Sequence, residues 1–290
     1  MMNSPVKKVA ALHDISGFGR SSLTVVIPVL SSMGVYVCPI PTAILSTNTS
    51  YPNPYYVDTT DMIEPILLHW KELGLEFDAI YSGFLGSPEQ CGIVAGMMDD
   101  FKRPNQIVVV DPVLGDNGRL YESVEQNMVD SMRKLICKAG IITPNITEAA
   151  LLLDEPVQNL YTVETVKDYL RRLSRFGPDI VVITGVLDNG KSHSYVIAYD
   201  SVDDKFWKVG CRYVPAEYPG AGDTFTSVMV GALLSGDSLP IALDRAINFV
   251  YYGIRSTYGY MVDPREGILQ EKILNTLAMP VPITAEEIES

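Results

Sequence analysis

The hydrophobic residues of this chain alternate between short runs rich in β-branched side chains and longer stretches with helical spacing. The short runs predict strands at Val9–Leu12, Val35–Ile40, Ala79–Tyr81, Ile107–Val110, Ile141–Ile142 and Ile180–Ile183. The longer stretches predict helices near residues 21–33, 59–74, 88–101, 121–138 and 162–176. Strands that alternate with helices indicate βαβ units, which build a mainly parallel sheet with helices on both faces.

The pattern changes in the last third of the chain. Ser194–Tyr199 and Phe206–Tyr213 flank acidic turn residues and predict an antiparallel hairpin at a sheet edge. From Gly222 onward the spacing is helical almost to the end, and the proline-containing, acidic residues 279–290 predict a tail. No linker, repeat or low-complexity tract interrupts the pattern, so we expect a single domain over residues 1–290 with its core at about 7–275.

Composition narrows the class of protein. With 290 residues, of which 47% are hydrophobic, the chain can bury one large core or two modest ones. The net charge of −13 argues against a nucleic-acid or anionic-membrane partner, because neutralising phosphates requires clustered Lys and Arg. We find neither a leader sequence nor an apolar run of about 18 residues, which predicts a soluble protein without a membrane span. The four cysteines lack metal-ligand spacing, which predicts reduced thiols, a cytoplasmic location and no structural zinc: Cys38, Cys91, Cys137 and Cys211.

The most informative stretch is the two-glycine turn Pro219–Phe225, which runs directly into a strongly periodic apolar helix. The first N–H groups of a helix have no intrahelical partner and carry the positive end of its dipole, so they form an anion site. Gly220 and Gly222 would let a phosphate approach the backbone closely. Asp223 then has two readings: it caps the helix, or it takes a proton from a substrate hydroxyl while the turn holds a phosphoryl group.

Polar residues and glycines also follow other predicted strands. In open α/β sheets, ligands bind beyond the carboxyl ends of the strands, so these residues are candidates for the same site. They lie in four segments: His13–Gly19, Asp111–Asp116, Thr143–Glu148 and Thr184–Gly185.

Two other motifs carry less weight. Gly185–Ser192 has the Walker A spacing and follows a strand, but the next residues have strand rather than helix composition, which favours a hairpin turn. Gly17–Ser22 nearly matches the dinucleotide-binding fingerprint but lacks its third glycine and the acidic residue about 20 positions later. No Ser/His/Asp constellation is readable, so the three histidines are assigned no catalytic role.

Four ordered motifs resemble those of the ribokinase superfamily, and within it most closely the vitamin B6 (pyridoxal, pyridoxine and pyridoxamine) kinases. The resemblance covers about residues 7 to 275. On the substrate side the resemblance is weaker and includes Tyr81–Phe84 and Leu45–Tyr51. In the second segment, Asn48 stands where the family has His and Ser50 where it has Gly. In the Gly220–Phe225 motif, Ala221 stands where the family usually has Thr. The four motifs are Asp14-x-Ser16-Gly17-x-Gly19, Asp111-Pro112-Val113-x-Gly115-Asp116, Thr143-Pro144-Asn145-x-x-Glu148 and Gly220–Phe225.

The resemblance implies a three-layer αβα sandwich without a large lid domain, a homodimer, and an enzyme that transfers the γ-phosphoryl group of ATP to the 5′-hydroxymethyl group of the vitamin. Asp223 would be the catalytic base. Gly220, together with the backbone amides of Ala221, Gly222 and Asp223, would form the anion hole. This agrees with the reading from the residues, since phosphoryl transfer mainly requires positioning and charge neutralisation.

For the nucleotide, the resemblance implies that Asp111 and Glu148 organise Mg²⁺, partly through waters. Asn145, Thr184 and Gly185, with Gly220 and Gly222, would line the phosphates. Helix capping is the alternative reading for Asn145 and Glu148.

On the substrate side, Asp14 or Ser16 would hydrogen-bond the ring and Thr49 another polar edge. Phe84 or Tyr51 would stack on the ring, with core packing as the alternative. Three other functions stay open: a hydroxymethylpyrimidine kinase, whose Asp-x-Ser-Gly-Gly-x-Gly start is similar to Asp14–Gly19; a sugar kinase; and a non-catalytic ligand-binding relative.

Overall fold

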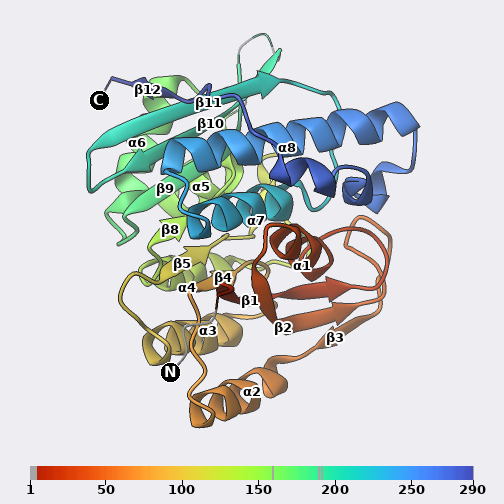
Figure 1. Ribbon diagram of the computed structural model, residues 1–290, viewed down its shortest axis with the longest axis vertical. Helices are drawn as coiled ribbons and strands as arrows, with labels where there is room; N and C mark the ends of the chain where they lie inside the picture. Colours follow the sequence, from red (N-terminus) through yellow and green to blue (C-terminus); the bar gives the residue numbers. More distant parts are fainter. Residues whose placement is uncertain (1–4, 159, 189, 191, 290) are drawn as a thin grey trace.

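A mixed β-sheet forms the centre of the computed structural model, which describes residues 5–158, 160–188, 190 and 192–289 (Figure 1). The strand order is β12-β11-β10-β9-β8-β5-β4-β1-β2-β3. The neighbours from β9 to β2 run parallel, and the pairings at both ends are antiparallel, which confirms the predicted sheet and edge hairpin. The strands are β1 (Lys8–Ser16), β2 (Tyr36–Leu45), β3 (Tyr56–Asp58), β4 (Ala79–Ser82), β5 (Ile107–Val110), β8 (Ile141–Ile142), β9 (Ile180–Leu187), β10 (His193–Asp200), β11 (Lys205–Arg212) and β12 (Glu286–Ile288).

Helices cover both faces of the sheet, as Figure 1 shows. One core contains buried residues of α1 (Leu23–Ser32), α7 (Ala221–Leu234) and α8 (Leu239–Tyr260). The other contains residues of α2 (Thr60–Glu72), α3 (Pro88–Asp100), α4 (Gln126–Ile136), α5 (Ile146–Leu153) and α6 (Val163–Ser174). Strand β1 supplies Val9 and Ala11 to the first core and Ala10 and Leu12 to the second, because successive side chains point to opposite faces. The three-layer αβα sandwich is confirmed.

The helix expected at 121–138 starts later than predicted. A short hairpin, β6 (Gly115–Asp116) and β7 (Arg119–Leu120), comes first, and α4 begins at Gln126. Asn117 and Gly118 form its turn with φ of 51° and 82°, the left-handed conformation that an Asn-Gly pair adopts readily. After the hairpin, residues 121–125 contain a turn in which the Val124 N–H donates to the Tyr121 carbonyl at 2.9 Å, so the helix begins five residues later than predicted.

The predicted tail at 279–290 is wrong for residues 284–288. Strand β12 pairs with β11, and Asp244 of α8, which has no exposed surface, accepts three hydrogen bonds from the segment just before it. The donors are the Thr284 N–H (2.8 Å), the Thr284 hydroxyl (2.6 Å) and the Ala285 N–H (2.9 Å). The composition of the segment gave no sign of these partners, because the acceptor lies some 40 residues away in the sequence. Between α8 and this segment lie three short 3₁₀ helices, Pro264–Glu266, Gln270–Lys272 and Leu274–Ala278.

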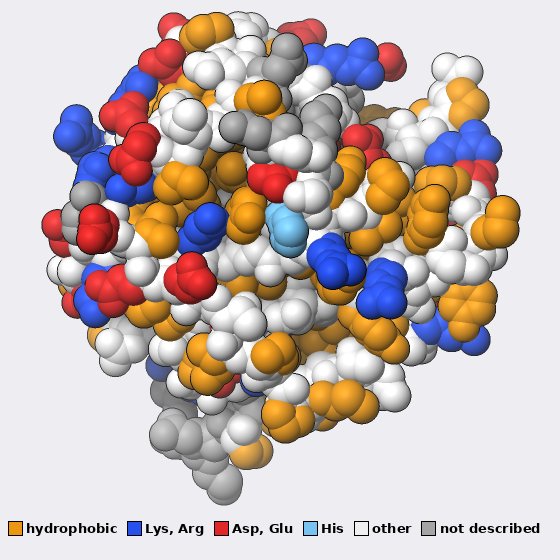
Figure 2. Space-filling view, turned by 90° about the horizontal axis from the view of Figure 1, so that it is seen from above, with side chains coloured by type: hydrophobic (Ala, Val, Ile, Leu, Met, Phe, Trp, Pro, Cys, Tyr) orange, Lys and Arg blue, Asp and Glu red, His pale blue; other side chains and the backbone are white. Residues whose placement is uncertain are grey.

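The surface carries charges of both signs. Figure 2 shows one face on which acidic and basic side chains lie among apolar ones. No helix in the described ranges is long and apolar enough to cross a membrane. The motif Gly185–Ser192 lies at the connection between two antiparallel strands. Strand β9 continues to Leu187 and β10 begins at His193, so the predicted hairpin turn is confirmed. Positions 189 and 191 of the motif lie outside the described residues.

Candidate active site

A cavity of about 960 Å³ lies at the carboxyl ends of the parallel strands. It is lined by nearly all of the predicted site residues, which come from β1, the β2–β3 loop, β4, β5, α5, β9 and α7. Tyr51 is the exception. The lining includes Asp14, Ser16, Thr49, Phe84, Asp111, Asn145, Glu148, Thr184, Gly185, Gly220, Ala221, Gly222 and Asp223.

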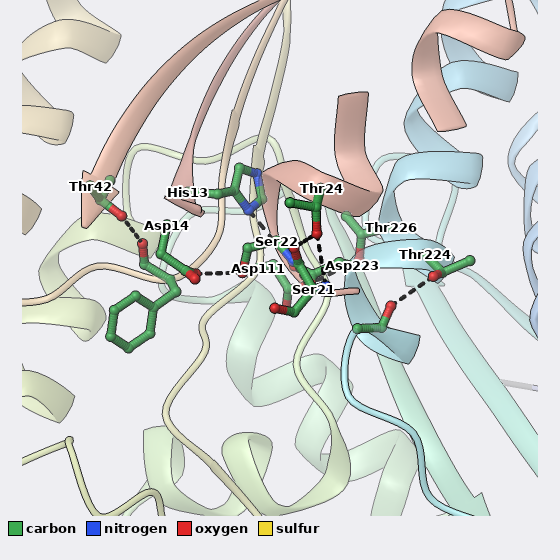
Figure 3. A network of polar contacts seen from close by, with 12 residues as sticks. His13, Asp14, Ser21, Ser22, Thr24, Thr42, Asp111, Asp223, Thr224 and Thr226 are labelled. Carbon is green, nitrogen blue, oxygen red and sulfur yellow. Dashed lines mark hydrogen bonds and ion pairs between the residues drawn. The ribbon is translucent and has the colours of Figure 1, made fainter. Parts of the chain in front are cut away.

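The first turn of α7 carries Asp223 into this cavity. Its Oδ2 accepts a 2.8 Å hydrogen bond from the Ser22 N–H, and its Oδ1 lies 3.8 Å from Nδ1 of His13 (Figure 3). Burial raises the pKa of Asp223 to about 6, the Ser22 hydrogen bond opposes the rise, and the charge of Asp14 adds to it. A carboxylate with a pKa near neutrality is suited to accept a proton and to give it up again.

The backbone before Asp223 is shaped as an anion site. Gly220 has φ of 78°, and a Cβ there would lie 2.4 Å from the Arg20 carbonyl oxygen, so the turn requires glycine. The Ala221 N–H is not free, because it donates to the Tyr218 carbonyl at 3.3 Å. Within the described part of the chain, the N–H groups of Gly222 and Asp223 have no acceptor. Of the three backbone amides predicted to form the anion hole, these two are therefore free to bind an anion.

Two further carboxylates, Asp111 and Glu148, are buried at the same rim. Burial and the charge of Asp223 raise the pKa of Asp111 to about 8; burial and the charge of Asp111 raise that of Glu148 well above its usual range. Among the described residues neither forms an ion pair with Lys or Arg. Buried acids without a cationic partner are an unfavourable arrangement that a bound cation would relieve.

The N-terminus of α5 forms a complete capping box. The Asn145 side chain accepts from the Glu148 N–H at 2.9 Å, and Glu148 Oε2 accepts from the Asn145 N–H at 2.8 Å. Glu148 Oε1 accepts from the Leu114 N–H at 3.1 Å, and the Asn145 amide donates to the Gly115 carbonyl at 2.8 Å. The capping alternative is thus confirmed for both residues. It fixes the Glu148 carboxylate at the cavity, where each oxygen retains a further lone pair.

The substrate side is built from β1, β4 and the β2–β3 loop. Asp14 accepts hydrogen bonds from the hydroxyls of Ser22 and, at 3.4 Å, Ser16. Phe84 also lines the cavity, and its carbonyl accepts from the Thr42 hydroxyl at 2.7 Å.

Tyr51 does not join this group. Its ring packs edge-on against Phe18, with centroids 5.6 Å apart, and lies 4.7 Å from the Arg265 guanidinium carbon. Tyr56, which the sequence did not single out, lines the cavity instead. Asn48, the residue found where the family has His, donates to the Arg265 carbonyl at 2.8 Å and so ties the β2–β3 loop to the turn after α8.

Two residues that contact Asp223 were not predicted from the sequence to belong to the site. His13 is fully buried and received no catalytic role; the structure places it against the carboxylate. Ser22 was not proposed at all. Its proximity to Asp223 depends on a contact between residues 201 positions apart, for which the sequence carries no local signal.

A largely buried carboxylate beside free amides at a helix N-terminus, at the carboxyl edge of a parallel sheet, defines a phosphoryl-transfer enzyme of the ribokinase-like class. Residues 27–266 match the family model described as phosphomethylpyrimidine kinase. The chain belongs to this family, and the ribokinase-like fold is confirmed by solved structures of related kinases.

Three relatives illustrate the similarity. A crystal structure of a candidate phosphomethylpyrimidine kinase of Bacteroides thetaiotaomicron is 54% identical, covers 99% of this chain and 100% of that one, and has a TM-score of 0.96; another crystal form of it contains pyridoxal. Pyridoxal kinase of Lactobacillus plantarum is 32% identical, covers 93% and 96% of the two chains, and has a TM-score of 0.85. Pyridoxal kinase PdxY of Burkholderia lata is 26% identical over 87% of this chain and 90% of its own.

Proposed function

We propose that this chain is an ATP-dependent vitamin B6 kinase that phosphorylates the 5′-hydroxymethyl group of pyridoxal, pyridoxine or pyridoxamine. The observation that carries the proposal is the position of Asp223, whose side chain is 12% exposed, beside the free Gly222 and Asp223 amides and facing a cavity that also contains Asp14. The 54% identical relative with pyridoxal in one of its crystal forms supports the choice of substrate.

Asp223 accepts the proton of the 5′-hydroxyl as that oxygen forms its bond to the γ-phosphorus. The bond from phosphorus to the bridging β–γ oxygen breaks, and ADP leaves with its electron pair. The N–H groups of Gly222 and Asp223 hold the phosphoryl oxygens during transfer, with the dipole of the 14-residue helix α7 behind them. The N–H groups and the carboxylate are held in place by the fold before the reaction, so they contribute by positioning the reactants and stabilising charge.

Asp111 and Glu148 would hold Mg²⁺, partly through water, because their buried carboxylates have raised pKa values and lack a basic side chain as partner within the described residues. No group of three or more metal-ligating side chains occurs in that part of the chain. Two carboxylates fit magnesium, which retains several waters and takes its other ligands from the nucleotide phosphates. When bound, the cation would neutralise charge on the transferring phosphoryl group.

The rest of the cavity would divide between the two substrates. Thr184 and Gly185 of β9 and Asn145, the N-cap of α5, would line the ATP phosphates. Asp14, Ser16 and Thr49 would hydrogen-bond the vitamin ring, and the Phe84 ring would pack against its face. We further propose a cytoplasmic homodimer; sedimentation of the purified protein would test its oligomeric state.

Hydroxymethylpyrimidine phosphorylation is the second candidate, favoured by the match to the phosphomethylpyrimidine kinase family model. Both substrates are planar heteroaromatics with a hydroxymethyl group, so the same base and anion hole serve either reaction.

The test is ADP release by purified protein with Mg-ATP and, separately, each B6 vitamer, hydroxymethylpyrimidine or ribose. Turnover on a vitamer that is lost in Asp223→Asn supports the proposal. Turnover on the pyrimidine alone would favour the second candidate, and turnover on ribose alone would indicate a sugar kinase. Binding without turnover would indicate a non-catalytic relative.

A further inference from the structure

Ser22 occupies an unusual backbone conformation beside the cavity. Its φ of 50° and ψ of −130° lie in a region that residues with a Cβ rarely adopt, and it is 6% exposed. Conformations of this kind cost free energy and persist only where the surroundings determine them, and they cluster at functional sites.

Both hydrogen-bond donors of Ser22 point to carboxylates. Its N–H donates to Oδ2 of Asp223 at 2.8 Å, and its hydroxyl donates to Oδ1 of Asp14. The dashed lines in Figure 3 show Ser22 joined to Asp14 and to Asp223. A single residue therefore connects the proposed base with the proposed ring-binding acid.

The ordinary role of a serine at this position is not the one observed. Ser22 is the N-cap of α1, and a serine there usually accepts a hydrogen bond from the N–H two or three residues later. The Ser22 side chain makes no such bond. Helix capping therefore does not account for the hydroxyl.

Neighbouring contacts hold the strained backbone in place. The Ser22 carbonyl accepts the N–H groups of Val25 and Val26, each at 2.9 Å. On the other side, the Ser21 N–H donates to the Thr24 hydroxyl at 3.1 Å and the Arg20 N–H to the Glu266 carbonyl at 2.9 Å. The direction of the Ser22 N–H is thus set by the fold before any ligand binds.

We propose that Ser22 is a positioning residue: its left-handed backbone aims the N–H at Asp223 while its hydroxyl fixes Asp14, so that the base and the ring-binding acid are held as one unit. This inference rests on the proposed kinase function. It assigns Ser22 two separable effects, one on turnover through Asp223 and one on vitamer binding through Asp14.

Two variants separate these effects. Ser22→Ala removes the hydroxyl but keeps a Cβ and the N–H. Ser22→Gly also removes the hydroxyl but gives the backbone the freedom to leave its strained conformation. Ser32→Ala, an exposed serine at the other end of the same helix, is the matched control.

We expect both Ser22 variants to weaken pyridoxal binding, measured by calorimetry, by about tenfold or more, with the KM for ATP within about twofold of the wild type, because a hydrogen bond to a charged group is lost. Ser22→Gly should have at least a further fivefold lower kcat than Ser22→Ala while melting at the same or a higher temperature. A merely structural role would make kcat follow the melting temperature. Ser32→Ala should match the wild type.

The inference is overturned if Ser22→Ala binds pyridoxal like the wild type, or if Ser22→Gly keeps the kcat of Ser22→Ala. Crystal structures of both variants provide a readout that does not depend on activity: the Asp223 carboxylate should be displaced or present in several positions in Ser22→Gly, and an unmoved carboxylate contradicts the proposal. A wild type that turns over no B6 vitamer would instead refute the proposed function, and the carboxylate positions would still decide the role of Ser22.

Discussion

The imidazole of His13 lies 3.8 Å from the Asp223 carboxylate, Nδ1 to Oδ1, yet the two do not form a charged pair. Burial lowers the pKa of His13 to about 3, so the ring is neutral at pH 7. Its edge meets the ring of Tyr81 with centroids 4.3 Å apart, and a Cβ at residue 83 would lie 2.2 Å from Nδ1, so only glycine leaves room for it. Because the His13 ring is neutral, the pKa of Asp223 stays raised, whereas a cation at the same place would lower it.

Turnover should depend on the Asp223 carboxylate. We expect Asp223→Asn to lower kcat by about 10²- to 10⁴-fold, the usual contribution of general base catalysis, while ATP and vitamer still bind. In the wild type, ionisation of Asp223 should make kcat/KM fall below about pH 6, or lower when Mg²⁺ is present, since a nearby cation favours the ionised form. Asp130→Asn, on the exposed face of α4, should leave kcat unchanged; a loss below tenfold in Asp223→Asn would contradict the assignment.

The same carboxylate should reduce stability at neutral pH. Its pKa in the folded protein, about 6, exceeds the ordinary 3.8, so between these values the folded state binds more protons than the unfolded state. Its contribution to the free energy of unfolding therefore falls as pH rises through this window and stays low above it. Asp223→Asn should gain up to about 3 kcal/mol over the wild type at pH 8 and much less at pH 4.5. Urea unfolding at the two pH values measures the difference.

His13 should have the opposite effect on stability. Its pKa falls from 6.5 to about 3 on folding, so below pH 6.5 the unfolded state binds the extra proton and the free energy of unfolding decreases as the pH is lowered. We expect the variant His13→Asn to lose less stability than the wild type between pH 6.5 and 4, by up to about 1.4 kcal/mol per pH unit. The comparison uses slopes, because the smaller side chain also leaves a cavity. His69→Asn, on α2, serves as control, and identical slopes would contradict the prediction.

The two glycines of the α7 turn should respond differently to a methyl group. In Gly220→Ala the Cβ meets the Arg20 carbonyl oxygen at 2.4 Å in a left-handed conformation, so both stability and activity should fall. In Gly222→Ala the nearest atom is Asp111 Oδ2 at 3.9 Å, an ordinary contact. That variant should melt at or above the wild-type temperature, because alanine favours helix, yet have a raised KM for ATP. Thermal melts and initial rates test the pair; a destabilised Gly222→Ala would be inconsistent with this geometry.

Magnesium binding should release a proton. The pKa of Asp111 is raised to about 8, so at pH 7 the carboxyl group of the free protein is largely protonated. A cation at Asp111 and Glu148 would ionise it. Calorimetric titration of the nucleotide-free protein with Mg²⁺ in buffers of different ionisation enthalpy should detect the released proton, and Asp111→Asn should reduce the proton release, with Glu148 as the remaining source. The same proton release in Asp111→Asn would place the cation elsewhere.

The sequence predicted the rim of the site because its parts lie at recognisable strand ends or helix starts. Asp14 lies near the end of β1, Asp111 directly follows β5, and Glu148 and Asp223 lie in the first turns of α5 and α7. The parallel order of the strands brings all four to one cavity. What it missed depends on contacts between distant segments. The conformation of Ser22 could not be read from its neighbours.

Tyr51 was predicted to line the site but does not. It stands in a motif segment, but the β2–β3 loop turns its ring toward Phe18 and Arg265, and Tyr56 reaches the cavity from the following strand. Loop geometry of this kind is set by tertiary contacts such as the hydrogen bond from Asn48 to the Arg265 carbonyl. A local motif match identifies the segment and leaves the side-chain direction undetermined.

The attachment of residues 284–288 has a consequence for synthesis on the ribosome. Asp244 is buried in α8, and its three donors, which lie on Thr284 and Ala285, are translated some 40 residues after it. Until they leave the exit tunnel, the nascent chain holds a carboxylate without these donors, and β11 has an open edge. A buried charge without partners is strongly destabilising. The final packing of α8 therefore awaits these residues, and truncation before Thr284 would leave every active-site residue in place and the core unfinished.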